Sequence, residues 1–278
     1  MIIDFHTHNF PDSLAPRAIA KMVEMTNNIV QPVGDGTLAM QLRDMTAAGV
    51  ERAVMLPVAT KPEQFEAILR RSLAVRDGAL GETVARRIIP FASLHPADTE
   101  LAAHIEAIVK AGLKGVKIHP FYQGFALDDP AVWPFFRAIR DAGLLLVSHC
   151  GYDPGYPGQS GVCGAKEVRK LLEAVPGLAP RFVAAHLGGY CGALEREVEL
   201  LRDSECWLDT ACVPYEQDKP EPRRIMATWP AERLLFATDY YWFSQPRLIA
   251  WVKALRPDPH EQELIFHANA ERLLASVR

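Results

Sequence analysis

The chain opens with two histidines that could bind a metal ion. His6 and His8 stand one residue apart at the end of the apolar run MIIDFHTH. Residues two apart on a strand share a face, so we expect both imidazoles, and Asp4 before them, to point the same way. Neutral imidazole is a natural ligand of divalent ions. Taken alone the pair is a weak signal, because a chain with nine histidines can contain such a pair by chance.

Other polar residues of the same chemistry stand where further apolar runs end. They are Lys117 in KGVKIHP, His149 in LLLVSHC, His186 in RFVAAHLGG and Asp239 in LLFATDYY. Burying an unpaired polar group costs roughly 2–7 kcal/mol, so gathering these side chains without a partner would be a poor structural choice. A divalent cation removes this cost, because imidazole nitrogen and carboxylate oxygen are its ligands. The pattern therefore predicts one metal centre built by His6, His8, Lys117, His149, His186 and Asp239.

Eight short apolar runs must position these residues, and each is followed by a polar loop and a helical pattern. The runs cover residues 1–8, 52–58, 87–96, 114–120, 144–150, 181–189, 206–212 and 234–241. Several are apolar on both faces, which is typical of a buried parallel sheet. Eightfold alternation of strand and helix without a break in composition predicts a (β/α)8 TIM barrel, formed by a single domain over residues 1–278.

An open, doubly wound α/β sheet is the alternative architecture. It is disfavoured because no glycine-rich phosphate loop follows the first run. Three connections, 9–34, 151–163 and 213–224, are longer than simple turns, and loops of that length are usually functional. All three follow strands, which places them on the C-terminal face, where such barrels carry their active sites.

Composition restricts the remaining possibilities. The formal net charge is −4 and no basic block is present, which argues against nucleic-acid binding. No apolar run approaches the length of a membrane span, and the N-terminus lacks the features of a signal peptide. Five cysteines form no disulfide framework and favour a reducing cytoplasm. Cys150 adjoins His149 and should face the helices rather than the barrel interior, which argues against a thiol nucleophile.

The ordered motifs IDFHTH, GVKIHP, SHCG, AHLGG and ATDYY resemble those of the amidohydrolase superfamily, in particular its amidohydrolase 2 branch. The resemblance covers essentially the whole chain. It implies a (β/α)8 barrel that holds one or two divalent ions, most often zinc. It also implies that His6, His8 and Asp239 bind a first ion. His149 would complete that site or belong to a second, and His186 would touch a second ion or hydrogen-bond the attacking water.

Lys117 allows three interpretations within this resemblance. It could be carboxylated and bridge two ions, bind a substrate carboxylate as an ordinary cation, or form a structural ion pair. His119 shares its face and is expected either to line the substrate pocket or to be structural. The segment ATDYY departs from the more usual GSDxP because Tyr241 replaces the proline, which changes the loop beside the metal but keeps the aspartate.

The expected chemistry follows from the metal. A divalent cation lowers the pKa of a water that it binds toward about 7. Asp239 would then act as general base and pass the proton to the leaving group, while His186 donates a hydrogen bond to the developing oxyanion. Aromatic residues on the loops of this face suggest a flat or apolar substrate, although such residues also seal barrels and form subunit contacts. They include Phe121, Tyr122, Tyr152, Tyr156, Tyr190, Tyr215, Tyr240 and Tyr241, of which Tyr152 and Tyr240 are the predicted substrate-binding residues.

Three functions remain open. The first is a hydrolase that cleaves a C–O or C–N bond in a small, possibly cyclic or aromatic, substrate. The second is a decarboxylase of an aromatic or unsaturated acid, because the same branch includes such lyases and they use the same metal and aspartate. The third is a barrel that binds a ligand without turnover, which is disfavoured because every position of the predicted centre is filled. A homodimer is expected only from its general frequency among enzymes.

Overall fold

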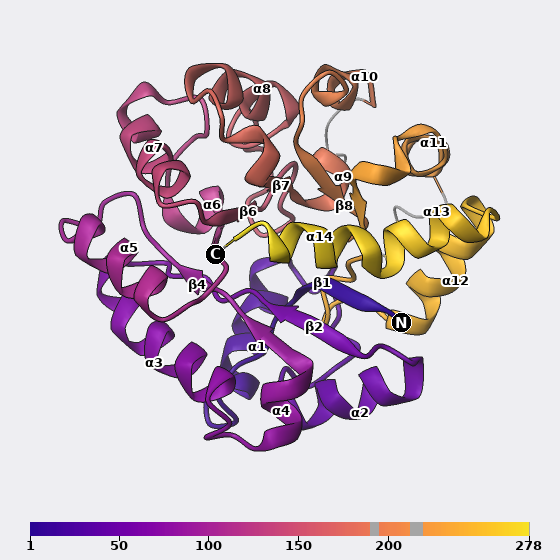
Figure 1. Ribbon diagram of the computed structural model, residues 1–278, viewed down its shortest axis with the longest axis horizontal. Helices are drawn as coiled ribbons and strands as arrows, with labels where there is room; N and C mark the ends of the chain where they lie inside the picture. The colour runs from indigo at the N-terminus through magenta and orange to yellow at the C-terminus, as the bar shows by residue number, and fades with distance from the viewer. Residues whose placement is uncertain (190–194, 212–218, 278) are drawn as a thin grey trace.

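The computed structural model describes residues 1–189, 195–211 and 219–277, and it contains nine short parallel strands (Figure 1). They are β1 Ile3–Thr7, β2 Arg52–Met55, β3 Ile88–Pro90, β4 Ala92–Ser93, β5 Gly115–Ile118, β6 Leu145–Ser148, β7 Phe182–Ala184, β8 Trp207–Asp209 and β9 Leu234–Leu235. The strands pair in the orders β1-β2-β3 and β4-β5-β6-β7-β8-β9. Each of the eight predicted runs contains a strand, and the run 87–96 contains two, β3 and β4.

Hydrogen bonds between the first strand and the segment after β9 close the cylinder. Phe5 N donates to Phe236 O at 2.8 Å, Asp239 N donates to His6 O at 2.8 Å, and His8 N donates to Tyr240 O at 2.6 Å. Because these bonds hold the end of the last strand against the first, they bring residues more than 230 positions apart into contact. The predicted TIM barrel is confirmed.

Helices surround the strands, and the last of them, Asn269–Ala275, lies across one end of the barrel (Figure 1). They are α1 Ala15–Met25, α2 Leu38–Ala48, α3 Phe65–Arg76, α4 Glu82–Arg87, α5 Leu101–Lys110, α6 Pro120–Gln123, α7 Trp133–Asp141, α8 Ala165–Ala174, α9 Ala185–Gly189, α10 Glu195–Val198, α11 Pro220–Thr228, α12 Gln245–Leu255, α13 Pro259–Glu263 and α14 Asn269–Ala275. Of the three long connections, 9–34 contains α1, and most of 213–224 lies outside the described residues or within α11. None of the helices in the described part of the chain has the length and apolar character to cross a membrane.

Capping residues set the ends of two helices. Thr37 caps α2 by accepting a hydrogen bond from Met40 N, and Gly49 ends it with a φ of 71°. Asp129 caps the short turn that leads into α7 by accepting from Ala131 N, and Gly143 follows that helix at a φ of 70°. A left-handed backbone at these two ends favours glycine, because other residues crowd their own carbonyl there.

Two apolar layers hold the barrel together. Inside it, Phe5 and Phe91 pack edge to face with ring centroids 6.1 Å apart, beside residues such as Val147 and Val183. The larger layer lies between strands and helices, and Cys150 belongs to it, as its position on the strand predicts. Burial raises the pKa of the Cys150 thiol, which argues further against a thiolate nucleophile.

One face assignment made from the sequence is wrong. The register between β1 and β2 shifts between Asp4 and Thr7, so β1 carries one extra residue there. Asp4 therefore lies on the outer side of the barrel, where its carboxylate accepts hydrogen bonds from Thr238 Oγ1 at 2.5 Å and Gln245 Nε2 at 2.9 Å. His6 still points inward with His8. Simple alternation cannot predict this, because a bulge reverses the faces within one strand.

Candidate metal centre

His6 and His8 both direct the Nε2 lone pair to the same point. His8 Nδ1 lies 2.7 Å from the carbonyl oxygen of Leu56, and a carbonyl can only accept, so the proton sits on Nδ1. His6 Nδ1 lies 2.8 Å from Asp209 Oδ2, which fixes the same tautomer. Burial, together with the nearby charge of Lys117, lowers the pKa of His6 well below its usual range, so its ring is neutral. Both histidines are thereby prepared to act as ligands.

Asp239 completes a three-residue cluster. Its Oδ1 lies 3.1 Å from His8 Nε2 and 3.6 Å from His6 Nε2, and the two imidazole nitrogens are 3.2 Å apart. Two bare lone pairs so close together repel each other unless a cation or a proton lies between them. The three ligand atoms lie within 4.8 Å of one another, which suits one divalent ion. The residue types and the tautomers therefore both fit a metal.

The ionisation of Asp239 follows from the same neighbours. Burial alone would raise the pKa of this carboxyl group. The contact with His8 and the positive charge of Lys117 act against burial, so the pKa of Asp239 lies below its ordinary value. The residue is a carboxylate at neutral pH and is able to bind a cation or accept a proton.

Lys117 is buried beside this cluster. Its Nζ lies 3.1 Å from His6 Nε2, with only 1% of the residue exposed. Burial lowers the pKa of Lys117, whereas the charges of Asp209 and Asp239 act in the opposite direction. The lysine thus lies where its nitrogen can either coordinate a metal ion held by His6 or form an ion pair with a substrate.

Asp209 is a functional candidate that the sequence reasoning missed. Besides facing His6, it accepts hydrogen bonds through Oδ1 from His186 N at 2.8 Å and Ala211 N at 3.1 Å. Burial raises the pKa of Asp209, and the charge of Lys117 opposes that rise. The signal was available in the run CWLDTAC, where this aspartate ends an apolar strand in the same way as the predicted residues do.

His186 lies in a left-handed turn that directs its ring into the barrel. Its φ is 58° and that of Leu187 is 53°, a conformation that costs about 1–2 kcal/mol for a residue with a side chain. Asp239 has the same unusual backbone, with a φ of 58°. His186 Nδ1 faces Ala211 O at 3.1 Å, so the proton lies on Nδ1, and Nε2 accepts a hydrogen bond from His149 Nδ1 at 3.0 Å.

His149 groups with a different set of residues. His119, His149 and Asp153 offer ligand atoms that all lie within 4.8 Å of one another. Asp153 Oδ2 lies 3.3 Å from His119 Nε2, while His119 Nδ1 and His149 Nε2 are buried without a hydrogen-bond partner. The structure therefore divides the predicted ligands between two neighbouring groups, with His186 between them.

Stacked rings extend from the histidines toward the mouth of the barrel. His119 stacks on Tyr122 with centroids 3.8 Å apart, and on His149 at 4.0 Å. Tyr156, from the loop after β6, stacks against Phe121 at 5.4 Å. These rings form a flat, largely apolar wall beside buried imidazole nitrogens.

The two tyrosines predicted to bind substrate lie in different surroundings. Tyr152 is 36% exposed, on the loop after β6. Tyr240 is buried and its hydroxyl donates to Asp44 Oδ2 of α2 at 2.6 Å, so its polar end turns toward the helix layer. Tyr190 and Tyr215, and the cysteines Cys191 and Cys212, lie outside the described residues.

A comparison with protein families supports the resemblance noted in the sequence. Residues 3–275 match the family model described as amidohydrolase, so the chain belongs to this family of enzymes. No functionally curated protein matches the chain significantly in sequence.

Solved structures share the fold at low sequence identity. An uncharacterised TIM-barrel protein from Bordetella bronchiseptica superposes with a TM-score of 0.78 at 20% identity, covering 99% of this chain and 98% of its own. A protein assigned as a 2-pyrone-4,6-dicarboxylic acid hydrolase from Pseudomonas putida gives 0.66 at 19% identity, with coverage of 99% and 97%. A 5-carboxyvanillate decarboxylase from Novosphingobium aromaticivorans, bound to manganese and 4-hydroxy-3-methoxy-5-nitrobenzoic acid, gives 0.65 at 17% identity, with coverage of 99% and 96%.

Proposed function

We propose that this chain is a metal-dependent hydrolase that cleaves a C–O or C–N bond in a small substrate. The observation that carries the proposal is the convergence of two unprotonated imidazole nitrogens and the Asp239 carboxylate on one point, with His6 and His8 fixed in the ligand tautomer. His6, His8 and Asp239 would hold the ion, and Lys117 would lie beside it. When bound, a divalent ion supplies a Lewis acid that activates water and polarises a carbonyl group.

Asp239 is the proposed general base. Its pKa lies below the usual value, so the group is ionised at neutral pH, and one of its oxygens lies 3.1 Å from His8 Nε2. The proton would then pass to the leaving group.

The proposed role of His186 changes with its tautomer. Because His186 Nδ1 faces the carbonyl of Ala211, Nε2 carries a lone pair that accepts a hydrogen bond. This supports the orientation of an attacking water or the binding of a second ion, and it disfavours donation to an oxyanion by the neutral ring.

Substrate binding is proposed for Lys117 and His119. The Lys117 ammonium is a buried cation that could pair with a substrate carboxylate. His119 offers the buried and unpartnered Nδ1 beside the flat wall formed with Tyr122. Tyr152 is retained as a residue at the rim, whereas the contact of Tyr240 with Asp44 supports a structural role instead.

Decarboxylation of an aromatic acid is the second candidate. It is favoured by the combination of the Lys117 cation and the stacked rings of Tyr122, His119 and His149. It is also consistent with the structurally similar decarboxylase, which binds a nitrobenzoic acid. We propose zinc as the first metal to test. Manganese should be tested beside it, because that neighbour holds manganese.

A panel of lactones, cyclic amides, esters and aromatic carboxylic acids, tested with protein loaded with zinc or manganese, separates the two functions. Hydrolysis releases acid without gas, whereas decarboxylation releases carbon dioxide. The proposal of a hydrolase is abandoned if turnover occurs only with release of carbon dioxide.

We also propose that the protein is cytoplasmic and forms a homodimer. The described cysteines Cys150, Cys163 and Cys206 are free and buried, which is compatible with a reducing compartment. Light scattering of the purified protein would establish the oligomeric state.

A further inference from the structure

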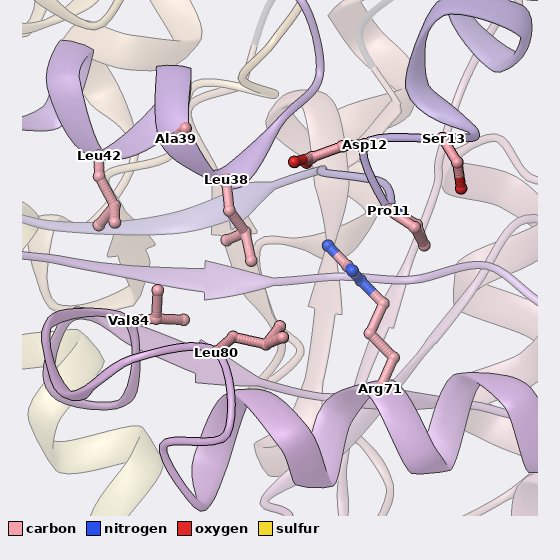
Figure 2. Close-up of a pocket in the computed structure, with 9 residues that line it drawn as sticks. All are labelled: Pro11, Asp12, Ser13, Leu38, Ala39, Leu42, Arg71, Leu80 and Val84. Atoms are coloured by element: carbon pink, nitrogen blue, oxygen red, sulfur yellow. The ribbon is translucent and has the colours of Figure 1, made fainter.

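A hollow of about 580 Å³ opens between α2 and α3, among residues distinct from those of the candidate metal centre (Figure 2). Leu38 and Leu42 of α2 face Leu80 and Val84 across it, and Leu80 is 44% exposed. The remaining lining residues are Pro11, Asp12, Ser13, Ala39 and Arg71. A cavity of this size with apolar walls and a few polar groups is typical of sites for small molecules.

Arg71 brings a positive charge into this hollow. Figure 2 shows its side chain rising from α3 toward the loop that carries Pro11 and Asp12. Its Nη2 donates to Asn9 Oδ1 at 2.7 Å, but its Nε is buried and has no hydrogen-bond partner. Within residues 1–189, 195–211 and 219–277, no acidic side chain forms an ion pair with it. Leaving a buried donor unsatisfied is unfavourable, so the guanidinium has unused capacity to bind an anion.

The guanidinium is held in place by a buried hydrogen-bond chain. Asn9 Nδ2 donates to Gln41 Oε1 at 2.8 Å, and Gln41 Nε2 donates to Thr7 Oγ1 at 2.9 Å. Asn9, Gln41 and Thr7 are all buried. Because the partner of Arg71 is itself fixed, a ligand that binds the guanidinium does not have to order a flexible side chain first.

We propose that this hollow is a second binding site, for a small carboxylic acid with a branched apolar body. The carboxylate would accept hydrogen bonds from Arg71, and the apolar body would cover Leu38, Leu42, Leu80 and Val84. Asp12 lines the same hollow and its negative charge disfavours a dianion such as phosphate. The site does not depend on the hydrolase proposed above.

Isothermal titration of the metal-free protein with 4-methylpentanoate tests the site, with 4-methylpentanamide as the neutral ligand of the same shape. We expect saturable binding of the acid, binding of the amide at least about tenfold weaker, and weak binding of inorganic phosphate. Arg71→Met should weaken binding of the acid about tenfold or more. The control Arg70→Met changes the exposed neighbour on the same helix and should leave the affinity unchanged.

Comparing the affinities of 4-methylpentanoate and 4-methylpentanamide for the unaltered chain tests the proposal even if Arg71→Met fails to fold. Equal affinity for the acid and the amide would overturn the proposal, because no charge would then be recognised. Binding of the acid that persists in Arg71→Met would also overturn it and would assign the ligand to the barrel mouth, where Lys117 is the competing cation.

Discussion

The imidazole Nδ1 of His6 lies 2.8 Å from Asp209 Oδ2, a contact that joins the first strand to the seventh predicted run. The other oxygen of Asp209 accepts two backbone N–H groups, from His186 and Ala211, so its orientation is fixed. Asp209 therefore decides which nitrogen of His6 carries the proton, and it leaves Nε2 free to bind a cation.

Asp209→Asn should weaken metal binding about 10–100-fold. The asparagine would keep its oxygen on the two backbone N–H groups and turn its amide NH2 toward His6 Nδ1. His6 would then move its proton to Nε2 and lose the ligand lone pair. A competition titration with a chromogenic chelator measures the affinity, with the exposed Asp203→Asn as the matched control. Equal affinities of the two variants would show that Asp209 does not set the tautomer.

Asp239→Asn should retain the fold and most of the metal but lower kcat by about 10²–10⁴-fold, because an amide cannot accept the proton. His6 and His8 keep their ligand tautomers through Asp209 and Leu56, so metal binding persists. The measurement is steady-state kinetics on the best substrate of the panel, with metal content determined on the same sample. Undiminished turnover would remove Asp239 as the base.

The free energy of unfolding should depend on pH through the titration of the Asp4 carboxyl group. Burial raises its pKa to about 6 from 3.8, and hydrogen bonds from Thr238 and Gln245 limit the rise. Between these values the folded chain keeps a proton that the unfolded chain has released. The free energy of unfolding therefore falls as pH rises from about 4 to about 6, by about 3 kcal/mol from this residue.

Asp4→Asn removes this titration. Urea denaturation measures the free energy of unfolding of the original chain and of Asp4→Asn at low and at neutral pH. The difference between the two chains should change by about 3 kcal/mol between these pH values, in favour of the variant at neutral pH. The exposed Asp203→Asn should show a constant difference. A constant difference for Asp4→Asn as well would mean that the carboxyl group is not buried as described.

Gln41→Leu should destabilise the chain by about 1–3 kcal/mol, because it leaves the buried Asn9 Nδ2 without its acceptor and removes the amide that donates to Thr7 Oγ1. Thr7 lies between His6 and His8, so we also expect weaker metal binding. Urea denaturation gives the first quantity and chelator competition the second. The exposed Gln159→Leu serves as control, and an unchanged free energy in Gln41→Leu would contradict the hydrogen-bond chain.

The sequence was sufficient for the barrel, because each of the eight apolar runs was followed by a polar loop and a helical pattern. It also identified His6, His8 and Asp239, which the structure brings together, since parallel strands of a barrel end around one mouth. It failed at Asp4, where an extra residue in β1 reverses the face. Tyr240 could not be placed either, because its hydroxyl finds Asp44 on a helix distant in sequence.

Metal analysis of the chain purified without chelator, then reconstituted with zinc or manganese, tests the central claim most directly. The account predicts at least one tightly bound ion per chain, and its loss in the double variant His6→Asn and His8→Asn, with unchanged content in the exposed His260→Asn. A chain that folds but binds neither metal, or a double variant that binds as tightly as the original, would contradict it.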